Sequence, residues 1–279
     1  MASGVLRSFG AGASVARAAL AWIRRDPNAH ALERTNFHGR TVTLAGGPAL
    51  ALGATVGAAI GARDGRTAAA ALTAGAVSGA VGLYDDVVGN RPDQKVFKGF
   101  AGHLGAAREG KVTSGLVKIA GVGAAAFVAS ALVGSSRRTK IGRATDVLLG
   151  AGVVAGTANL LNLLDLRPGR AIKASAVLGA PLALGRKGGV AAGTLGAASG
   201  LVADDLAEEI MLGDSGANAL GALLGVALIA RTGPAGRAAA LTALASLTAA
   251  SEKVSFTKVI EDTPWLRYLD ELGRRPAHQ

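Results

Sequence analysis

Two adjacent carboxylates, Asp85 and Asp86, are the residues whose types and spacing best suit chemistry. The 18 residues before them, 67–84, carry no charge. Acids at a helix C-terminus are disfavoured by the helix dipole and by each other, so the pair requires a nearby cation. A basic segment that ends at Lys111 follows directly. Carboxylates beside Lys and Arg at the mouth of an apolar helix indicate a divalent metal and phosphate oxygens; the alternative is a solvated helix end.

Further polar residues recur at the ends of later apolar runs. Asn159, Asn162 and Asp165 are spaced by three, which places them on one broad helix face, about 60° apart. The alternative for the asparagines is hydrogen bonding between helices. Asp214, in the sequence Gly213-Asp214-Ser215-Gly216, begins another apolar run. At the start of a helix the dipole favours a carboxylate.

Glycines and lysines complete the set of candidate binding residues. Gly46 and Gly47, followed by Pro48, begin an apolar run, where glycine lets a backbone approach a ligand closely; a plain turn is the alternative. Lys98 and Lys111 lie in the loop after the Asp pair, within reach of phosphates if they are not simply solvated.

Long charge-free runs must position these residues. The chain has 279 residues, 50% of them hydrophobic, a net charge of +11, a mean hydropathy of +0.37 and no Cys. Spanning a bilayer takes roughly 20 residues, and a soluble helix this long would show a polar face. The composition therefore predicts an all-α, polytopic integral membrane protein with about nine transmembrane helices and no nucleic-acid partner. The runs are Thr41–Ala62, Thr67–Tyr84, Ile119–Ser136, Val147–Leu164, Gly188–Ala203, Ser215–Ala230 and Ala238–Ser251, with weaker candidates at Ser8–Ile23 and Ala171–Leu184.

The loops between these runs predict the orientation in the membrane. Residues 1–251 form the expected helical domain, and residues 252–279 form a charged cytoplasmic tail. Alternating the loops between two sides gives 17 Lys and Arg on the side of the tail and 10 on the other. The richer side is cytoplasmic by the positive-inside rule. Of the 19 Asp and Glu, only Asp64 and Asp146 fall on the other side. The candidate site therefore faces the cytoplasm.

The order of these motifs resembles the polyprenyl-phosphate N-acetylhexosamine-1-phosphate transferase superfamily. This group includes phospho-N-acetylmuramoyl-pentapeptide transferase and the GlcNAc-1-phosphate transferases. The resemblance covers roughly residues 34–258. It rests on four features in the family order: the Gly-rich entry Leu44–Pro48, the pair Asp85-Asp86, the run Asn159/Asn162/Asp165, and Gly213-Asp214-Ser215-Gly216.

The resemblance implies a glycosyl-1-phosphate transferase in the cell membrane. Such an enzyme moves a sugar-1-phosphate, here N-acetylhexosamine-1-phosphate, from a UDP-sugar to undecaprenyl or decaprenyl phosphate and releases UMP, in peptidoglycan or envelope polysaccharide synthesis. Its cofactor is Mg²⁺, with Mn²⁺ as the alternative, and a homodimer is left open. Asp85, Asp86 and Asp214 are the implied catalytic residues, with Asp214 and Asp86 as metal ligands. The implied substrate-binding residues are Asn159, Asn162, Asp165, Lys98, Lys111, Gly46, Gly47 and Gly213.

Some residues depart from the family pattern, and these departures support an alternative to a typical member. Pro168 stands where members often carry a second Asp, Met211 replaces the usual aromatic, and the His-rich loop after the ninth helix is missing. These changes argue against a pentapeptide substrate. They also support a catalytically degenerate member that binds a lipid precursor or acts as a scaffold. An ion transporter is disfavoured because the acids cluster at helix ends rather than deep within the runs.

Overall fold

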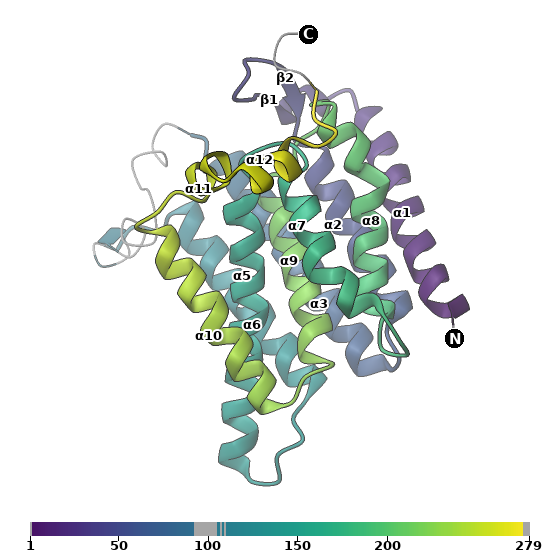
Figure 1. Cartoon of the computed structure of the whole chain (residues 1–279), viewed down its shortest axis with the longest axis vertical. Coiled ribbons are helices and arrows are strands. Elements are labelled where there is room, and N and C mark those ends of the chain that lie inside the picture. Colours follow the sequence, from purple (N-terminus) through teal and green to yellow (C-terminus); the bar gives the residue numbers. More distant parts are fainter. Residues whose placement is uncertain (1, 92–104, 107, 109, 276–279) are drawn as a thin grey trace.

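The computed structural model describes residues 2–91, 105, 106, 108 and 110–275, and most of these are helical. Within that part of the chain, nine helices of 14 or more residues run alternately up and down one bundle (Figure 1). Each predicted apolar run falls largely within one of them. The nine are α1 (Ala2–Arg24), α2 (Gly46–Gly61), α3 (Gly65–Val88), α5 (Ser114–Val133), α6 (Lys140–Leu164), α7 (Arg170–Ala183), α8 (Gly189–Leu206), α9 (Gly213–Ile229) and α10 (Pro234–Ser251).

Several of these helices begin at a side chain that caps them. Asp64 accepts a hydrogen bond from the backbone N–H of Thr67 (2.8 Å) at the start of α3. Thr113 and Thr139 cap α5 and α6 in the same way. Such a cap satisfies one of the free N–H groups of the first turn and contributes about 1 kcal/mol. The cap residues explain where runs rich in Ala and Gly begin as helices.

The core of the bundle is built around α9. Of its 17 residues, 14 are buried, and the helix packs against α2, α3, α6 and α8. Small residues allow the close packing, because Cβ atoms at Gly221 and Gly225 would lie against the backbone of α6. The N-terminus of α9 therefore lies in the middle of one end of the bundle, surrounded by the ends of other helices.

Glycines also bring α1, α2 and α8 into backbone contact. A Cβ at Gly193 of α8 would overlap the backbone carbonyl of Gly57 in α2, and one at Gly189 would overlap that of Gly61. Gly12 of α1 meets the same part of α8. Such close approach of small residues is typical of helix association in membranes.

Among the described residues, three helices are long and apolar enough to cross a membrane by length and composition: α3, α5 and α6. The helices α2 and α9 are also apolar but shorter. Large apolar side chains on the outside of the long helices are exposed, among them Leu72, Phe127 and Leu148. A surface of this kind suits lipid better than water. These features agree with an all-α membrane protein.

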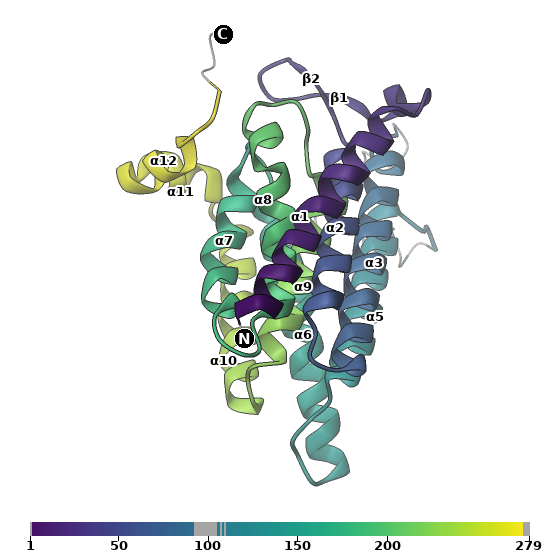
Figure 2. The same cartoon turned by 90° about the vertical axis from the view of Figure 1, so that its right-hand side faces the viewer.

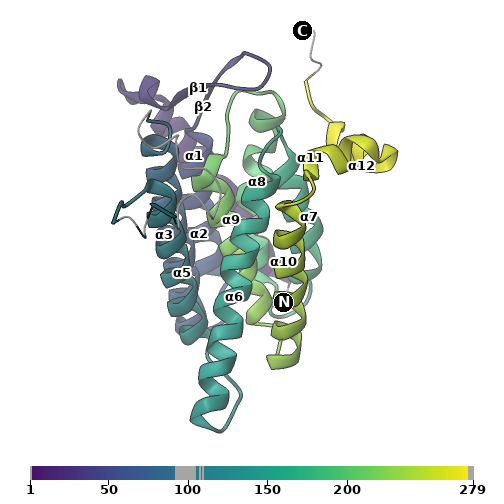
Figure 3. The same ribbon diagram turned by 90° about the vertical axis from the view of Figure 1, so that its left-hand side faces the viewer.

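One end of the bundle carries additional structure. A short antiparallel hairpin pairs β1 (Glu33–Thr35) with β2 (Thr41–Thr43) after the 3₁₀ turn η1 (Ala29–Leu32). At the same end, α11 (Phe256–Asp262) and α12 (Pro264–Glu271) lie across the bundle direction (Figures 2 and 3). The tail predicted as merely charged is thus folded into two helices up to residue 271.

The contact between Gly193 and Gly57 predicts a large effect of one methyl group. We expect Gly193→Ala to lower the free energy of unfolding by about 1–3 kcal/mol, because the new Cβ meets backbone that has no room to move. The midpoint of thermal unfolding in detergent measures this. Gly123→Ala in α5 is the matched control, because a Cβ there meets nothing within 4 Å. Equal midpoints for the two variants would contradict the packing.

Candidate functional site

A lysine bridges two of the predicted carboxylates at the end of the bundle that carries the hairpin. The Nζ atom of Lys118 lies 2.7 Å from Asp85 Oδ2 and 2.5 Å from Asp214 Oδ2. The three residues come from α5, α3 and α9, which adjoin one another at this end. The hydroxyl of Ser114 also hydrogen-bonds to Asp85. Lys118 is therefore the cation that balances Asp85, one member of the acid pair, and it does so together with Asp214.

Asp86, the neighbour of Asp85, holds the N-terminus of α9. Its Oδ1 accepts the backbone N–H of Asp214 and its Oδ2 accepts that of Ser215, both at 2.9 Å. This satisfies two of the free N–H groups of the buried helix and places a negative charge at the positive end of its dipole. The prediction made Asp86 a metal ligand; in the structure both of its carboxylate oxygens accept backbone N–H groups of α9.

Gly213 makes that contact possible. Its φ of +57° lies in the left-handed region that glycine adopts freely, and a Cβ there would lie 2.7 Å from Asp86 Oδ1. The glycine was predicted to bind substrate. Its position shows a structural requirement, since any side chain would push Asp86 away from α9.

Two residues of the run Asn159/Asn162/Asp165 contact the start of α9, and the third does not. The side-chain amide of Asn162 donates to Asp214 Oδ1, and Asn218 donates to the backbone carbonyl of Asp214 (2.7 Å). Asp165, directly after α6, accepts the backbone N–H of Gly213. Asn159 instead donates to Thr248 Oγ1 (3.1 Å) on α10. Asn159 thus makes the helix-to-helix hydrogen bond that was the alternative for it.

Asp165 lies among other carboxylates. Burial raises its pKa well above the ordinary range, and the charges of Asp205, Asp214 and Asp86 raise it further. Its neighbour Asp205 accepts the backbone N–H of Gly169 (2.7 Å). A carboxyl with a raised pKa beside several charged ones responds strongly to a bound cation.

The glycines of the entry segment contact the loop that carries Asp214. A Cβ at Gly46 would lie 2.8 Å from the carbonyl oxygen of Met211, and one at Gly47 would overlap that of Leu212. Thr43 hydrogen-bonds to the same loop through Met211 (2.8 Å). These glycines serve close approach to protein backbone, and no ligand is needed to explain them.

Of the two lysines predicted to bind phosphate, the structure describes Lys111. Lys98 lies outside the described residues. Lys111 comes just before α5 at this end of the bundle, and its side chain is exposed. Lys118, which the sequence analysis did not select, contacts both Asp85 and Asp214 directly. The signal for it was its position, because it is the last charge before the apolar run that begins at Ile119.

A second polar group, also not predicted, ties the hairpin to the loop before α9. Glu208 is buried at an unusual positive φ of 57° and pairs with Arg40 at 3.3 Å. It also accepts from His38 (2.9 Å) and from the amide of Asn36. Next to it is a cavity of about 200 Å³ whose wall includes Phe37, Asp165, Arg167, Asp205 and Met211. The Arg167 guanidinium lies over the Phe37 ring, 4.3 Å from its centre.

A larger cavity, of about 670 Å³, lies at the opposite end of the bundle. Arg66, Arg143 and Lys187 line it together with the buried ion pair of Arg237 and Asp146 (3.1 Å). None of the predicted site residues reaches it. The larger cavity is therefore separate from the candidate site, where Lys118 and Asn162 contact Asp214.

The types and positions of the acidic side chains at this end of the bundle determine whether a divalent metal fits there. Among the described residues, no group of three or more His, Asp or Glu is arranged to hold a metal ion. Asp85 and Asp214 nevertheless converge on one point, where the Lys118 ammonium lies. Two carboxylates suit Mg²⁺, which takes its remaining ligands from water and phosphate. Asp85 and Asp214 therefore have the ligand type that Mg²⁺ prefers, and in the structure the cation between them is Lys118.

Comparison with known proteins adds no assignment. No protein-family model matches the chain, and no curated protein matches it either. The evidence for a function is therefore the motif order and the geometry of the site.

Removing Lys118 tests the charge balance of the site. We expect Lys118→Met to lower the free energy of unfolding by about 2 kcal/mol, because Asp85 and Asp214 lose charged hydrogen bonds and then repel each other. Added Mg²⁺ should raise the thermal midpoint of this variant more than that of the parent protein. Lys187→Met, at the opposite end of the bundle, is the control. A Lys118→Met variant as stable as the control would contradict the bridging role.

Proposed function

We propose that this chain is a multi-pass membrane glycosyl-1-phosphate transferase. It moves N-acetylhexosamine-1-phosphate from a UDP-sugar to polyprenyl phosphate at the cytoplasmic face of the cell membrane. The observation that carries the proposal is the convergence of Asp85, Asp214, Lys118 and Asn162 at one end of an apolar bundle. These residues come from four helices, and three of them belong to motifs in the order of the transferase superfamily.

The chemistry joins two anionic phosphates, so the site must supply positive charge. An oxygen of the lipid phosphate forms a bond to the β-phosphorus of the UDP-sugar, and the bond from that phosphorus to the UMP oxygen breaks. Asp85 and Asp214 would hold Mg²⁺, which neutralises charge on the phosphates as the bond changes occur. Lys118 is then free to contact a phosphate oxygen, and Asn162 keeps Asp214 oriented.

The nine long helices support a nine-span topology. Neighbouring helices alternate in direction, and the basic cytoplasmic side of the positive-inside count is the end where Asp85 and Asp214 lie. The shorter helices reach across a bilayer only with flanking Arg and Lys that extend to the headgroups.

Two hollows adjoin the carboxylates, and they support separate sites for the two proposed substrates. The cavity beside Phe37 has a mainly apolar lining with Asp165 and Arg167 in its wall, and it lies on the side of the hairpin, which suits a nucleotide with its base and phosphates. A mostly apolar groove of about 240 Å³ runs between α2 and α3, lined by Pro48, Leu52 and Ala80, and reaches Ser215 next to Asp214. A groove with this lining suits a polyprenyl chain whose phosphate must meet the acids.

Release of UMP tests the enzymatic claim. Purified protein in detergent is incubated with UDP-GlcNAc, undecaprenyl phosphate and Mg²⁺, and a panel of UDP-sugars follows. We expect Asp214→Asn to reduce the rate by about 100-fold or more, because it removes charge that balances the metal and Lys118. Asp64→Asn, at the opposite end, is the control and should keep the rate. If no UDP-sugar yields more UMP with the parent protein than with Asp214→Asn, the claim fails.

Filling the apolar groove tests the lipid site separately. Ala80→Phe should raise the KM for polyprenyl phosphate about tenfold, which corresponds to 1.4 kcal/mol, and leave the KM for the UDP-sugar unchanged. Leu72→Phe, on the same helix but outside the groove, is the matched control. A change in both KM values, or in neither, would contradict this assignment of the groove.

One observation favours a second candidate, a non-catalytic relative that binds a lipid precursor or acts as a scaffold. The Lys118 ammonium already balances Asp85 and Asp214, and Asp86 is engaged as the cap of α9. Such a cluster is complete without a metal. Binding of polyprenyl phosphate that is unchanged in Asp85→Asn, with no UMP release from any UDP-sugar, would favour this candidate over the enzyme.

A further inference from the structure

The C-terminal helix α12 turns its apolar side away from the protein. Trp265, Tyr268, Leu269 and Leu272 follow the spacing of one helix face, and their exposed fractions are 64%, 67%, 50% and 54%. Asp270 lies about 140° around the helix from Trp265 and is buried. A helix of a water-soluble protein shows the opposite arrangement, with the apolar face inside.

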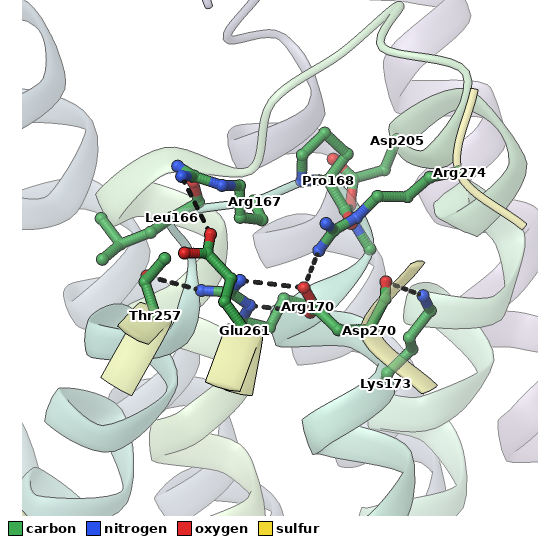
Figure 4. Close-up of polar contacts among 11 residues, drawn as sticks. Leu166, Arg167, Pro168, Arg170, Lys173, Asp205, Thr257, Glu261, Asp270 and Arg274 are labelled. Atoms are coloured by element: carbon green, nitrogen blue, oxygen red, sulfur yellow. Dashed lines mark hydrogen bonds and ion pairs between the residues drawn. The ribbon is translucent and has the colours of Figure 1, made fainter. Parts of the chain in front are cut away.

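Ion pairs hold the polar side of α12 against the bundle (Figure 4). Arg170, at the start of α7, donates from Nε and Nη2 to the two carboxylate oxygens of Asp270, at 2.8 and 2.9 Å. Arg274 lies 2.7 Å from the same carboxylate, and Lys173 donates to the backbone carbonyl of Asp270 (2.6 Å). A bidentate pair with a second arginine fixes both position and rotation. The apolar stripe is therefore held outward by strong contacts.

The pKa of Asp270 agrees with this anchoring. Burial opposes its ionisation, but the hydrogen bond from Arg170 and the charges of Arg274 and Arg170 outweigh burial and hold the pKa below its ordinary value. The carboxylate is therefore charged at neutral pH, and the anchor is complete.

The position of α12 indicates what covers the stripe. The helix lies across the bundle direction at the end that carries the candidate site (Figures 2 and 3). The chain has only two Trp and two Tyr. All four are exposed and belong to this end: Trp22 near the end of α1, Tyr84 near the end of α3, and Trp265 and Tyr268 in α12. Trp and Tyr gather where membrane meets water, because one part of each side chain is apolar and another part is polar.

We propose that α12 is an interfacial helix that inserts Trp265, Tyr268, Leu269 and Leu272 into the boundary between lipid and water beside the bundle. The attraction is apolar rather than electrostatic, because residues 252–275 carry five Lys or Arg and five Asp or Glu. Binding therefore needs no anionic lipid. Through Arg170 the helix fixes how deep the start of α7 lies in the membrane, next to Pro168 and Asp205 (Figure 4).

Fluorescence of Trp265 in a membrane tests the proposal. The variant Trp22→Phe leaves Trp265 as the single Trp, and the full chain is placed in vesicles of phosphatidylcholine. We expect a nitroxide on the upper acyl chain of the lipid to quench Trp265 more strongly than a nitroxide at the chain end, and iodide in the water to quench it little. Adding phosphatidylglycerol should leave this pattern unchanged.

Two variants serve as controls. Leu269→Glu, introduced with Trp22→Phe at an exposed position, should increase quenching by iodide and reduce quenching by lipid. Trp265→Phe leaves only Trp22, and it gives the quenching by lipid and by iodide of an exposed Trp on α1 at the same end, with which Trp265 is compared. Strong quenching of Trp265 by iodide without quenching by lipid overturns the proposal. The proposal is also overturned if Trp265 loses its protection from iodide when the protein is diluted with lipid. That result would mean that a second copy of the chain, and not lipid, covers the stripe.

Discussion

The carboxylate of Asp86 binds the N-terminus of α9, and the arrangement of the site depends on this contact. A helix with 14 of its 17 residues buried takes free N–H groups of its first turn out of water, where an unpaired group costs free energy. Asp86 satisfies two of them and adds favourable charge at the positive end of the dipole. Gly213 is needed beside it, because a Cβ there would lie 2.7 Å from Asp86 Oδ1, and Gly46 and Gly47 let α2 approach the segment that leads into α9.

The same contact explains how two adjacent acids are tolerated at the end of α3. Asp86 is balanced by the dipole of α9, whereas Asp85 is balanced by Lys118, which it shares with Asp214. Neighbouring residues in the sequence thus meet different partners. The division leaves Asp85 and Asp214 as the pair that faces a shared cation, and it gives Asp86 a positioning role within the proposed transferase site.

The surface has an apolar region along the long helices and a charged region at one end of the bundle. The long helices α3, α5 and α6 expose apolar side chains along their length, while all of the acids within the described residues except Asp64 and Asp146 lie toward one end. Charged contacts at that end, from Arg170 to Asp270 and from Arg40 to Glu208, fasten segments distant in the sequence. Where α12 is held by its polar side, its apolar side is left for the membrane.

The sequence alone determined the helices, because charge-free runs bounded by capping and charged residues define a helix locally; each of the nine runs falls largely within one helix of the bundle. It also determined that Asp85, Asp165 and Asp214 belong to one end, since helix direction alternates along the chain. Only the tertiary structure decided which side chains meet. Asn159 and Asn162 share a helix, yet the first contacts α10 and the second contacts Asp214. Lys118 became visible as the shared cation only when α3, α5 and α9 were placed together, because such pairing depends on the rotation and depth of each helix, which local sequence does not specify.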